Sequence, residues 1–421
     1  MLLILLRMYK TWRMSNLKKQ MEILIIFLLI FSNSVRSQPL VFPLELQDKT
    51  TADLKEGAER TDKYFSLIAG KSIAIVAHPA SVVGFKHLVD TLVKSGIKIK
   101  KIFAPEHGFR GDEEAGQAIK NHIDKKTGLS VISLYGKNYK PKTEYLKDVQ
   151  IVLFDLQDVG ARFYTYISTL HYVMEACAEN KKQLIVLDRP NPNGYYIDGP
   201  VLDPKFKSFT GMHPVPVVYG MTIGEYAQMI NGEGWLPNGV KCDLTVIPVE
   251  NYTHEDLYQL PVKPSPNLPT MSSVYLYPSL CLFEGTFVSV GRGTAKPFQQ
   301  FGYPGLKGSE HFFTPIPMKG ASENPMYNNQ LCSGFDVSNY GEMYVKYFRK
   351  IYLFWIQNLY KNCETKDNFF NNYFNSIAGN EVLKKQIIDG VKEEDIRKSW
   401  DPGLQKFKLI RKKYLLYKDF E

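Results

Sequence analysis

The sequence predicts an α/β fold with a mostly parallel sheet, and two observations support this prediction. From Ser72 to about residue 187, short apolar runs alternate with longer segments in which apolar residues recur at helical spacing. The apolar runs are continuous and do not alternate with polar residues, which is typical of strands that helices cover on both faces. We therefore expect a parallel sheet in this part of the chain, with helices in its connections.

Five apolar runs are predicted to be strands: residues 72–77, 97–103, 131–134, 150–154 and 184–187. One covering helix is expected to begin near Phe85 and to end at Gly96. A second helix is expected at residues 164–179, where four apolar side chains share a face: Ile167, Leu170, Met174 and Cys177.

Polar side chains follow four of the predicted strands directly. They are His78, Glu106, His107, Asp155, Gln157, Asp188 and Arg189. Open α/β sheets bind ligands outside the carboxyl ends of their strands, so these residues can converge although they are far apart in sequence. Polar residues also end strands because loops are exposed, and each residue taken alone keeps that simpler explanation.

The strand and helix alternation fades after Pro190, and proline-rich turns replace it at residues 189–194 and 263–269. The second turn is a plausible domain boundary. We expect an N-terminal domain at residues 57–263 and a smaller α+β domain at residues 264–421, with aromatic-rich helices between 340 and 360.

Residues 1–37 are predicted to be a signal peptide. Lys18 and Lys19 precede an apolar stretch of nine residues, 23–31, and small residues lead to a cleavage site after Ser37. Nine residues are fewer than the ~20 that a membrane-spanning helix needs, so stable membrane insertion is not expected. Export to the periplasm or the exterior is the expected localisation.

Charge and composition argue against several classes of partner and cofactor. Without the leader, which holds six Lys or Arg and one acid, the net charge falls from +9 to +4, and no basic stripe indicates a nucleic-acid partner. The five cysteines show neither zinc spacing nor Cys-x-x-Cys, so burial is the expectation for each. No His-Glu-x-x-His or Gly-x-Gly-x-x-Gly motif is present, so no metal or other cofactor is expected.

Two glutamates stand in loops that carry glycine and arginine. Glu106 lies in Phe103-Ala-Pro-Glu-His-Gly-Phe-Arg-Gly111, and Glu284 lies in Leu282-Phe-Glu-Gly-Thr-Phe-Val-Ser-Val-Gly-Arg-Gly-Thr294. A fold that brings two carboxyl groups together can support acid/base chemistry. The structural alternatives are a Glu106–Arg110 ion pair and a Glu284 side chain that caps the turn at Gly285.

Six ordered motifs resemble the NamZ family of exo-β-N-acetylmuramidases. They are Ala104-Pro-Glu-His-Gly-Phe-Arg-Gly111, residues 155–166 (DLQDVGARFYTY), residues 187–194 (LDRPNPNG), residues 220–225 (GMTIGE), residues 264–269 (PSPNLP), and residues 283–286 with 291–298 (FEGT and GRGTAKPF). The resemblance implies a Rossmann-like N-terminal domain, a smaller C-terminal α+β domain and an active site in the cleft between them. It also implies release of non-reducing terminal N-acetylmuramic acid (MurNAc) from β-1,4-linked peptidoglycan fragments.

Two segments depart from the family pattern. An asparagine-containing turn is expected after the first strand, where this chain has His78-Pro79-Ala80, and a Trp and an Arg are expected where it has Tyr252-Thr-His254. Substrate specificity depends on these positions if they contact the substrate.

Most glycosidases use two carboxyl groups. Glu106 is the candidate general acid, and Glu284 is the candidate base or the group that polarises the substrate's 2-acetamido substituent. The lactyl carboxylate of MurNAc suits a guanidinium, for which Arg292 is the first candidate and Arg162 and Arg189 compete. The other candidate substrate-binding residues are His107, Arg110, Tyr164, Asp155, Asp188 and Asn267.

Two other classes of function stay open at this stage. A secreted peptidoglycan-binding protein would keep the cleft without turnover, although retention of Glu106 favours an enzyme. An esterase or amidase acting on wall substituents is the weaker possibility, because no Gly-x-Ser-x-Gly surrounds Ser81 or Ser289.

Overall fold

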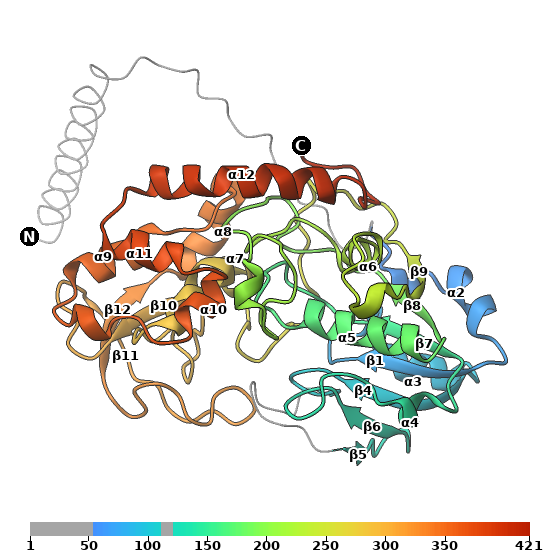
Figure 1. Cartoon of the computed structure of the whole chain (residues 1–421). Helices are drawn as coiled ribbons and strands as arrows, with labels where there is room; N and C mark the ends of the chain where they lie inside the picture. Colours follow the sequence, from blue (N-terminus) through green and yellow to red (C-terminus); the bar gives the residue numbers. More distant parts are fainter. Residues whose placement is uncertain (1–53, 111–120) are drawn as a thin grey trace, which may run out of the picture. The chain divides into compact units, whose positions relative to one another are not determined.

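A mostly parallel sheet forms the centre of the N-terminal part of the protein (Figure 1). The structure is a computed structural model that describes residues 54–110 and 121–421, so the predicted signal peptide at 1–37 lies outside the described residues. Within the described residues the sheet has seven strands in the order β5-β6-β4-β1-β7-β8-β9. All neighbours pair in parallel except β5 and β6, which are antiparallel.

The five predicted strands are confirmed as β1 (Ser72–Ala77), β4 (Lys98–Ala104), β6 (Ser130–Ser133), β7 (Ile151–Asp155) and β8 (Gln183–Leu187). Two further strands, β5 (His122–Ile123) and β9 (Asp243–Ile247), were not predicted. Strand β9 is half exposed at the sheet edge, and Asp243 and Thr245 interrupt its apolar run. The parallel α/β prediction is therefore correct, but the sheet extends beyond Pro190.

Helices cover both faces of the sheet. Ile73 and Ile75 of β1 pack into a hydrophobic cluster with α2 (Thr61–Ile68) and α3 (Leu88–Lys94). Ala74 and Val76 pack on the opposite face with α5 (Tyr166–Glu179) and α6 (Ile223–Gly232). Full burial of one Val, Leu or Ile side chain contributes roughly 1.5–3 kcal/mol, so this two-sided packing fixes the strand ends that carry the polar side chains.

The predicted helix start at Phe85 is wrong. Phe85 lies in a hairpin of β2 (Val82–Val83) and β3 (Lys86–His87), and its side chain is fully exposed. The helix begins at Leu88, where the Nδ1 atom of His87 accepts a hydrogen bond from the Val89 amide at 3.2 Å. The helical spacing of Phe85 was coincidental, because Gly84, with φ 57°, turns the chain before the helix.

The C-terminal part is α+β, as expected (Figure 1). Helix α7 (Met271–Leu280) continues into the 3₁₀ turn η4 (Cys281–Gly285), and a small antiparallel sheet follows in the order β10 (Gln300–Tyr303), β12 (Cys332–Asp336), β11 (His311–Phe313). The remaining helices are α8 (Ser338–Phe348), α9 (Phe354–Asn362), α10 (Phe374–Ala378), α11 (Val382–Ile388) and α12 (Glu393–Arg411).

One hydrophobic cluster contains side chains from both parts of the chain, including Phe154 of β7 and Phe283 of η4. The predicted domain boundary at residues 263 and 264 therefore stays a prediction, because no break in the core marks it. Among the residues that the structure describes, no helix is long and apolar enough to cross a membrane.

Candidate active site

Glu106 and Glu284 line the same cavity, which has a volume of about 370 Å³. The loop after β4 supplies Glu106, and η4 supplies Glu284, so each part of the chain contributes one carboxyl group. The predicted site residues that line the cavity are Glu106, His107, Tyr164, Asn267, Glu284 and Arg292. The volume lies in the range of small-molecule sites, and the walls combine aromatic rings with a few polar groups, as such sites do.

The Glu106 carboxyl contacts the start of α5. The Thr165 hydroxyl donates to its Oε2 atom at 2.7 Å. Tyr135 lines the same cavity, and burial and the nearby Glu106 carboxylate both raise the pKa of its phenol. The proposed Glu106–Arg110 ion pair is not formed, since Arg110 binds the carboxylates of Asp90 and Asp124.

Glu284 and Arg292 form an ion pair at the cavity wall, with Nη1 of Arg292 3.0 Å from Oε1 of Glu284. Both side chains keep partial exposure, 31% for Arg292 and 26% for Glu284. Burial acts to lower the pKa of Arg292, but the carboxylates of Glu284 and Glu106 raise it overall, so the guanidinium stays charged. Within the described part of the chain, the Arg292 guanidinium donates to Glu284 alone, which leaves its Nε and Nη2 edge for a ligand.

The glycines on each side of Arg292 are required by backbone conformation. Gly291 and Gly293 have φ of 75° and 82°, values that residues with side chains rarely adopt. A Cβ atom on Gly291 would lie 2.7 Å from the side chain of Gln300, and one on Gly293 would lie 2.6 Å from Pro325. The backbone of this loop therefore requires both glycines, and the arginine between them lines the cavity.

His107 and Asn267 carry buried polar atoms with no hydrogen-bond partner among the described residues. These atoms are Nδ1 of His107 and Oδ1 of Asn267, and both side chains line the cavity. Burial lowers the pKa of His107, which favours the neutral ring. Unpaired buried polar atoms are costly, so these two are available to a polar ligand such as a sugar.

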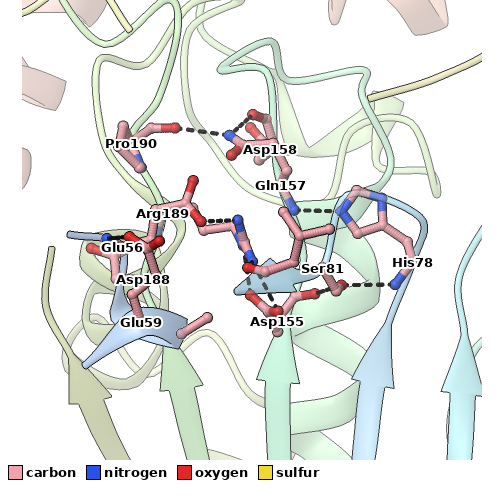
Figure 2. A network of polar contacts seen from close by, with 12 residues as sticks. Glu56, Glu59, His78, Ser81, Asp155, Gln157, Asp158, Asp188, Arg189 and Pro190 are labelled. Carbon is pink, nitrogen blue, oxygen red and sulfur yellow. Dashed lines mark hydrogen bonds and ion pairs between the residues drawn. The ribbon is translucent and has the colours of Figure 1, made fainter. Parts of the chain in front are cut away.

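Arg189 and Asp155 do not line the cavity. Figure 2 shows them in a buried network at the carboxyl ends of the strands, where Arg189 lies between Asp155 and Glu56. The guanidinium bonds Asp155 at 2.6 and 3.0 Å, and Nη1 also bonds Glu56. The one guanidinium serves both buried carboxyl groups, so the positions of Arg189 and Asp155 favour a structural role over the expected substrate contact.

Arg162 and Asp188 are also fully buried away from the cavity. Arg162 donates to four main-chain carbonyls and so joins α10 to the N-terminal part: those of Pro200, Val215, Ile377 and Ala378. Asp188 accepts from the hydroxyls of Thr222 at 2.7 Å and Tyr417 at 2.5 Å. Burial raises the pKa of Asp188 to about 6. The expectation that these two residues bind substrate is not supported by their positions.

Arg110 is the last predicted residue that lies outside the cavity. It bridges Asp90 and Asp124 and faces a different cavity, with Lys86 and Lys126 nearby. Arg110 is close to Glu106 in sequence, but the chain turns at residues 106–110, so the two side chains face different cavities. The predicted substrate contact of Arg110 is therefore not supported.

Several cavity residues were not predicted: Tyr135, Thr165, Tyr277, Cys281 and Tyr373. Cys281 is buried as expected, yet its Sγ atom lies 3.5 Å from Oε2 of Glu284. Burial, with both carboxylates adding to the effect, raises the pKa of Tyr373 to about 12. Thr165 lies within the motif at residues 155–166, which was a usable signal, whereas the other four residues lie outside the quoted motifs. No cluster of three or more metal-ligating side chains occurs among residues 54–110 and 121–421.

Comparisons with known proteins identify the family of this chain. The family profile described as "Exo-beta-N-acetylmuramidase NamZ, N-terminal" matches residues 73–272, and its C-terminal counterpart matches residues 275–417. The peptidoglycan beta-N-acetylmuramidase NamZ of Bacillus subtilis (strain 168) is 40% identical over 381 residues, which cover 84% of this chain and 89% of that protein.

Two solved structures of DUF1343 family proteins from Bacteroides fragilis have the same fold. One is 45% identical with a TM-score of 0.80, and the other is 28% identical with a TM-score of 0.72. Each alignment covers 87% of this chain and 99% of the solved chain. On the matching profiles, the identity and the coverage, this chain belongs to the NamZ family.

Proposed function

We propose that this protein is an exo-acting glycoside hydrolase that releases non-reducing terminal MurNAc from β-1,4-linked peptidoglycan fragments. The observation that carries the proposal is the pairing of Glu106 and Glu284 in one cavity with the Arg292 guanidinium. Glycosidic hydrolysis needs a proton donor and a second polar group, and MurNAc adds a carboxylate that a guanidinium recognises.

Glu106 is the proposed general acid. In this role its carboxyl donates a proton to the glycosidic oxygen as the bond to the leaving N-acetylglucosamine (GlcNAc) breaks. The hydrogen bond from Thr165 restrains the carboxyl rotamer, so the donor is oriented before the substrate binds. Tyr135 supplies an aromatic wall beside it, next to the stacked rings of Phe209 and Tyr139, whose centroids are 4.0 Å apart.

Glu284 is the proposed second carboxylate. It either activates water at the anomeric carbon or orients the 2-acetamido group, whose oxygen then attacks that carbon. Its Oε1 atom accepts from Arg292 and its main-chain oxygen accepts from Asn371 at 3.1 Å, which fix the position of the group. The Nε and Nη2 edge of Arg292 is directed to the lactyl carboxylate of MurNAc in a bidentate contact.

We expect the Arg292→Lys variant to lose discrimination between MurNAc-β-1,4-GlcNAc and chitobiose, which lacks the lactyl group. Lysine keeps the charge but loses the planar fork, and the loss of charge-assisted bonds of ~1.5–3 kcal/mol corresponds to roughly ten- to a hundredfold in kcat/KM for the MurNAc substrate. Steady-state kinetics on both disaccharides measure the ratio. An equal loss on both substrates would show that Arg292 acts through Glu284 and not through the lactyl group.

The proposed function is tested with two disaccharides of opposite order. The purified protein is expected to release free MurNAc from MurNAc-β-1,4-GlcNAc and to leave GlcNAc-β-1,4-MurNAc intact, because an exo-enzyme reads the non-reducing end. Chromatography with mass detection follows both reactions. Binding of the first disaccharide without cleavage would favour a wall-binding protein, and cleavage of both in equal measure would contradict the exo-acting assignment.

A further inference from the structure

The general-acid candidate lies in a tight turn that has an unusual residue at its third position. The amide of Gly108 donates to the carbonyl of Pro105 at 3.1 Å, which closes a four-residue turn with Glu106 and His107 at its centre. His107 has φ 71°, whereas Glu106 is not among the residues with positive φ. This combination defines a type II turn, whose third position glycine or asparagine normally occupies.

A histidine at this position favours a different turn. Rotation of the peptide between Glu106 and His107 converts a type II turn into a type I turn, in which the third residue has φ near −90° and most residues are accepted. The left-handed conformation of a residue with a side chain persists only where the surroundings hold it. That rotation would reverse the direction of the Glu106 carbonyl and move its neighbouring side chains.

The Tyr166 hydroxyl is placed to prevent this rotation. It donates to the Glu106 carbonyl at 3.2 Å, while the preceding residue, Thr165, donates to the Glu106 carboxyl. Two consecutive residues at the start of α5 thus hold the main chain and the side chain of the proposed acid. The bond to the carbonyl exists in the type II turn and is lost if the peptide rotates.

His78 sets the direction of the Tyr166 hydroxyl. Figure 2 shows His78 beside Gln157, whose main-chain N–H donates to Nε2 of the ring at 2.9 Å. An amide can only donate, so Nε2 is the acceptor and the proton of the neutral ring lies on Nδ1. Nδ1 is 3.2 Å from the Tyr166 oxygen and donates to it, which leaves the phenolic proton for the Glu106 carbonyl.

His78 is itself fixed and uncharged. Its amide donates to Ser81 Oγ at 2.9 Å, and that hydroxyl donates to the carbonyl of Asp155. Burial lowers the pKa of His78 well below its usual value, and Arg189 nearby acts in the same direction. The buried network of Figure 2 therefore extends through His78 to the turn that carries Glu106.

We propose that Tyr166, oriented by His78, is a positioning residue that holds the Glu106–His107 peptide in the type II turn and so places the proposed general acid. The proposal rests on the proposed function for its kinetic consequence. It attributes to Tyr166 no contact with the reacting atoms.

The test is a double-mutant cycle between Tyr166→Phe and His107→Gly. Glycine accepts the positive φ without strain and favours the type II turn, so it removes the need for the Tyr166 hydroxyl. We expect Tyr166→Phe to lower kcat for MurNAc release by between about ten- and a hundredfold when residue 107 is histidine. In the His107→Gly background, Tyr166→Phe should lower kcat by less than about threefold, because the turn no longer depends on the Tyr166 hydroxyl. Any direct contact of His107 with substrate cancels in the cycle.

Tyr226→Phe is the matched control. Its hydroxyl is also buried and also bonds a buried histidine, His213, at 3.0 Å, but it does not line the cavity. We expect its kcat to stay within about twofold of the unmodified protein. An equal effect of Tyr166→Phe in both backgrounds, or no effect in either, would overturn the proposal.

Crystal structures of the variants keep the test independent of activity. If the unmodified protein releases no MurNAc, the proposed function fails, while the direction of the Glu106 carbonyl in Tyr166→Phe still tests the turn. If the Glu106–His107 peptide is rotated in Tyr166→Phe and the type II turn is restored in the double variant, the positioning role of Tyr166 is supported. An unrotated peptide in Tyr166→Phe contradicts it.

Discussion

Replacing Glu106 with glutamine is expected to lower kcat/KM for MurNAc-β-1,4-GlcNAc by a factor of about 10²–10⁴, the usual contribution of a positioned general acid. Glutamine keeps the size of the side chain and can still accept from Thr165, but it has no proton to give to the glycosidic oxygen. Circular dichroism and thermal unfolding establish that the variant is folded. Steady-state release of MurNAc then measures the loss.

The leaving group identifies the step that is lost. An aryl β-MurNAc substrate, such as the 4-nitrophenyl glycoside, departs without protonation, so we expect Glu106→Gln to lose far less activity on it than on the disaccharide. Glu179→Gln serves as the control, because Glu179 is exposed, pairs with Lys140 and does not line the cavity. Equal losses on both substrates would assign Glu106 a role other than proton donation.

Replacing Arg189 with methionine is expected to destabilise the protein by about 3–5 kcal/mol, the cost of breaking a buried ion pair by removing one partner. Arg189 is 2% exposed, and its loss leaves Asp155 and Glu56 buried without a cation. Chemical denaturation at pH 8 measures the free energy of unfolding. Burial raises the pKa of both carboxyls, a direction that Arg189 opposes.

The loss should depend on pH with a defined sign. A carboxyl whose pKa is raised in the folded state binds its proton more readily there, so the folded state gains stability as pH falls. Without Arg189 the pKa of Asp155 and Glu56 rises further, so the gain in stability at low pH is larger. We therefore expect Arg189→Met to be less destabilising at pH 5 than at pH 8.

Arg110→Met is the matched control for Arg189→Met. Arg110 also bridges two carboxylates, but it is 27% exposed, and without it Asp90 keeps its ion pair with Lys126 while Asp124 keeps the hydrogen bonds from Thr127, so a loss of less than ~2 kcal/mol is expected. Equal losses in the two variants would contradict the distinction between a buried structural arginine and a solvated one.

Much of the fold was predictable, because parallel strands buried on both faces leave continuous apolar runs such as Ile73 to Val76. Strand β9 was missed since most of its residues are half exposed and since Asp243 and Thr245 break the apolar run. Phe85 shows the converse error: a residue at helical spacing need not be in the helix when a glycine turn precedes it.

The two carboxyl groups and Arg292 of the candidate site were predictable from the sequence, whereas the burial of Arg162 and Arg189 away from it was not. Glu106, Glu284 and Arg292 belong to loops whose glycines reveal an unusual backbone, and they meet in one cavity. Arg162 and Arg189 also lie in family motifs, yet both are buried. Arg162 bonds main-chain carbonyls, and Arg189 pairs with buried carboxylates. Sequence gives the position of a charge along the chain, whereas burial depends on neighbours such as Glu56 that are distant in sequence.

The contact between Tyr417 and Asp188 has a consequence for synthesis. The loop after β8 is completed by a hydroxyl from residue 417, and the amide of Val249 donates to the same oxygen at 2.9 Å. A ribosome that has translated the whole sheet has therefore supplied the Thr222 hydroxyl and the Gly224 amide that bond Asp188, but not yet the Tyr417 hydroxyl. Tyr417 lies 170 residues beyond Ile247, the last residue of β9, so this hydroxyl joins the sheet only after the C-terminal part of the chain has been made.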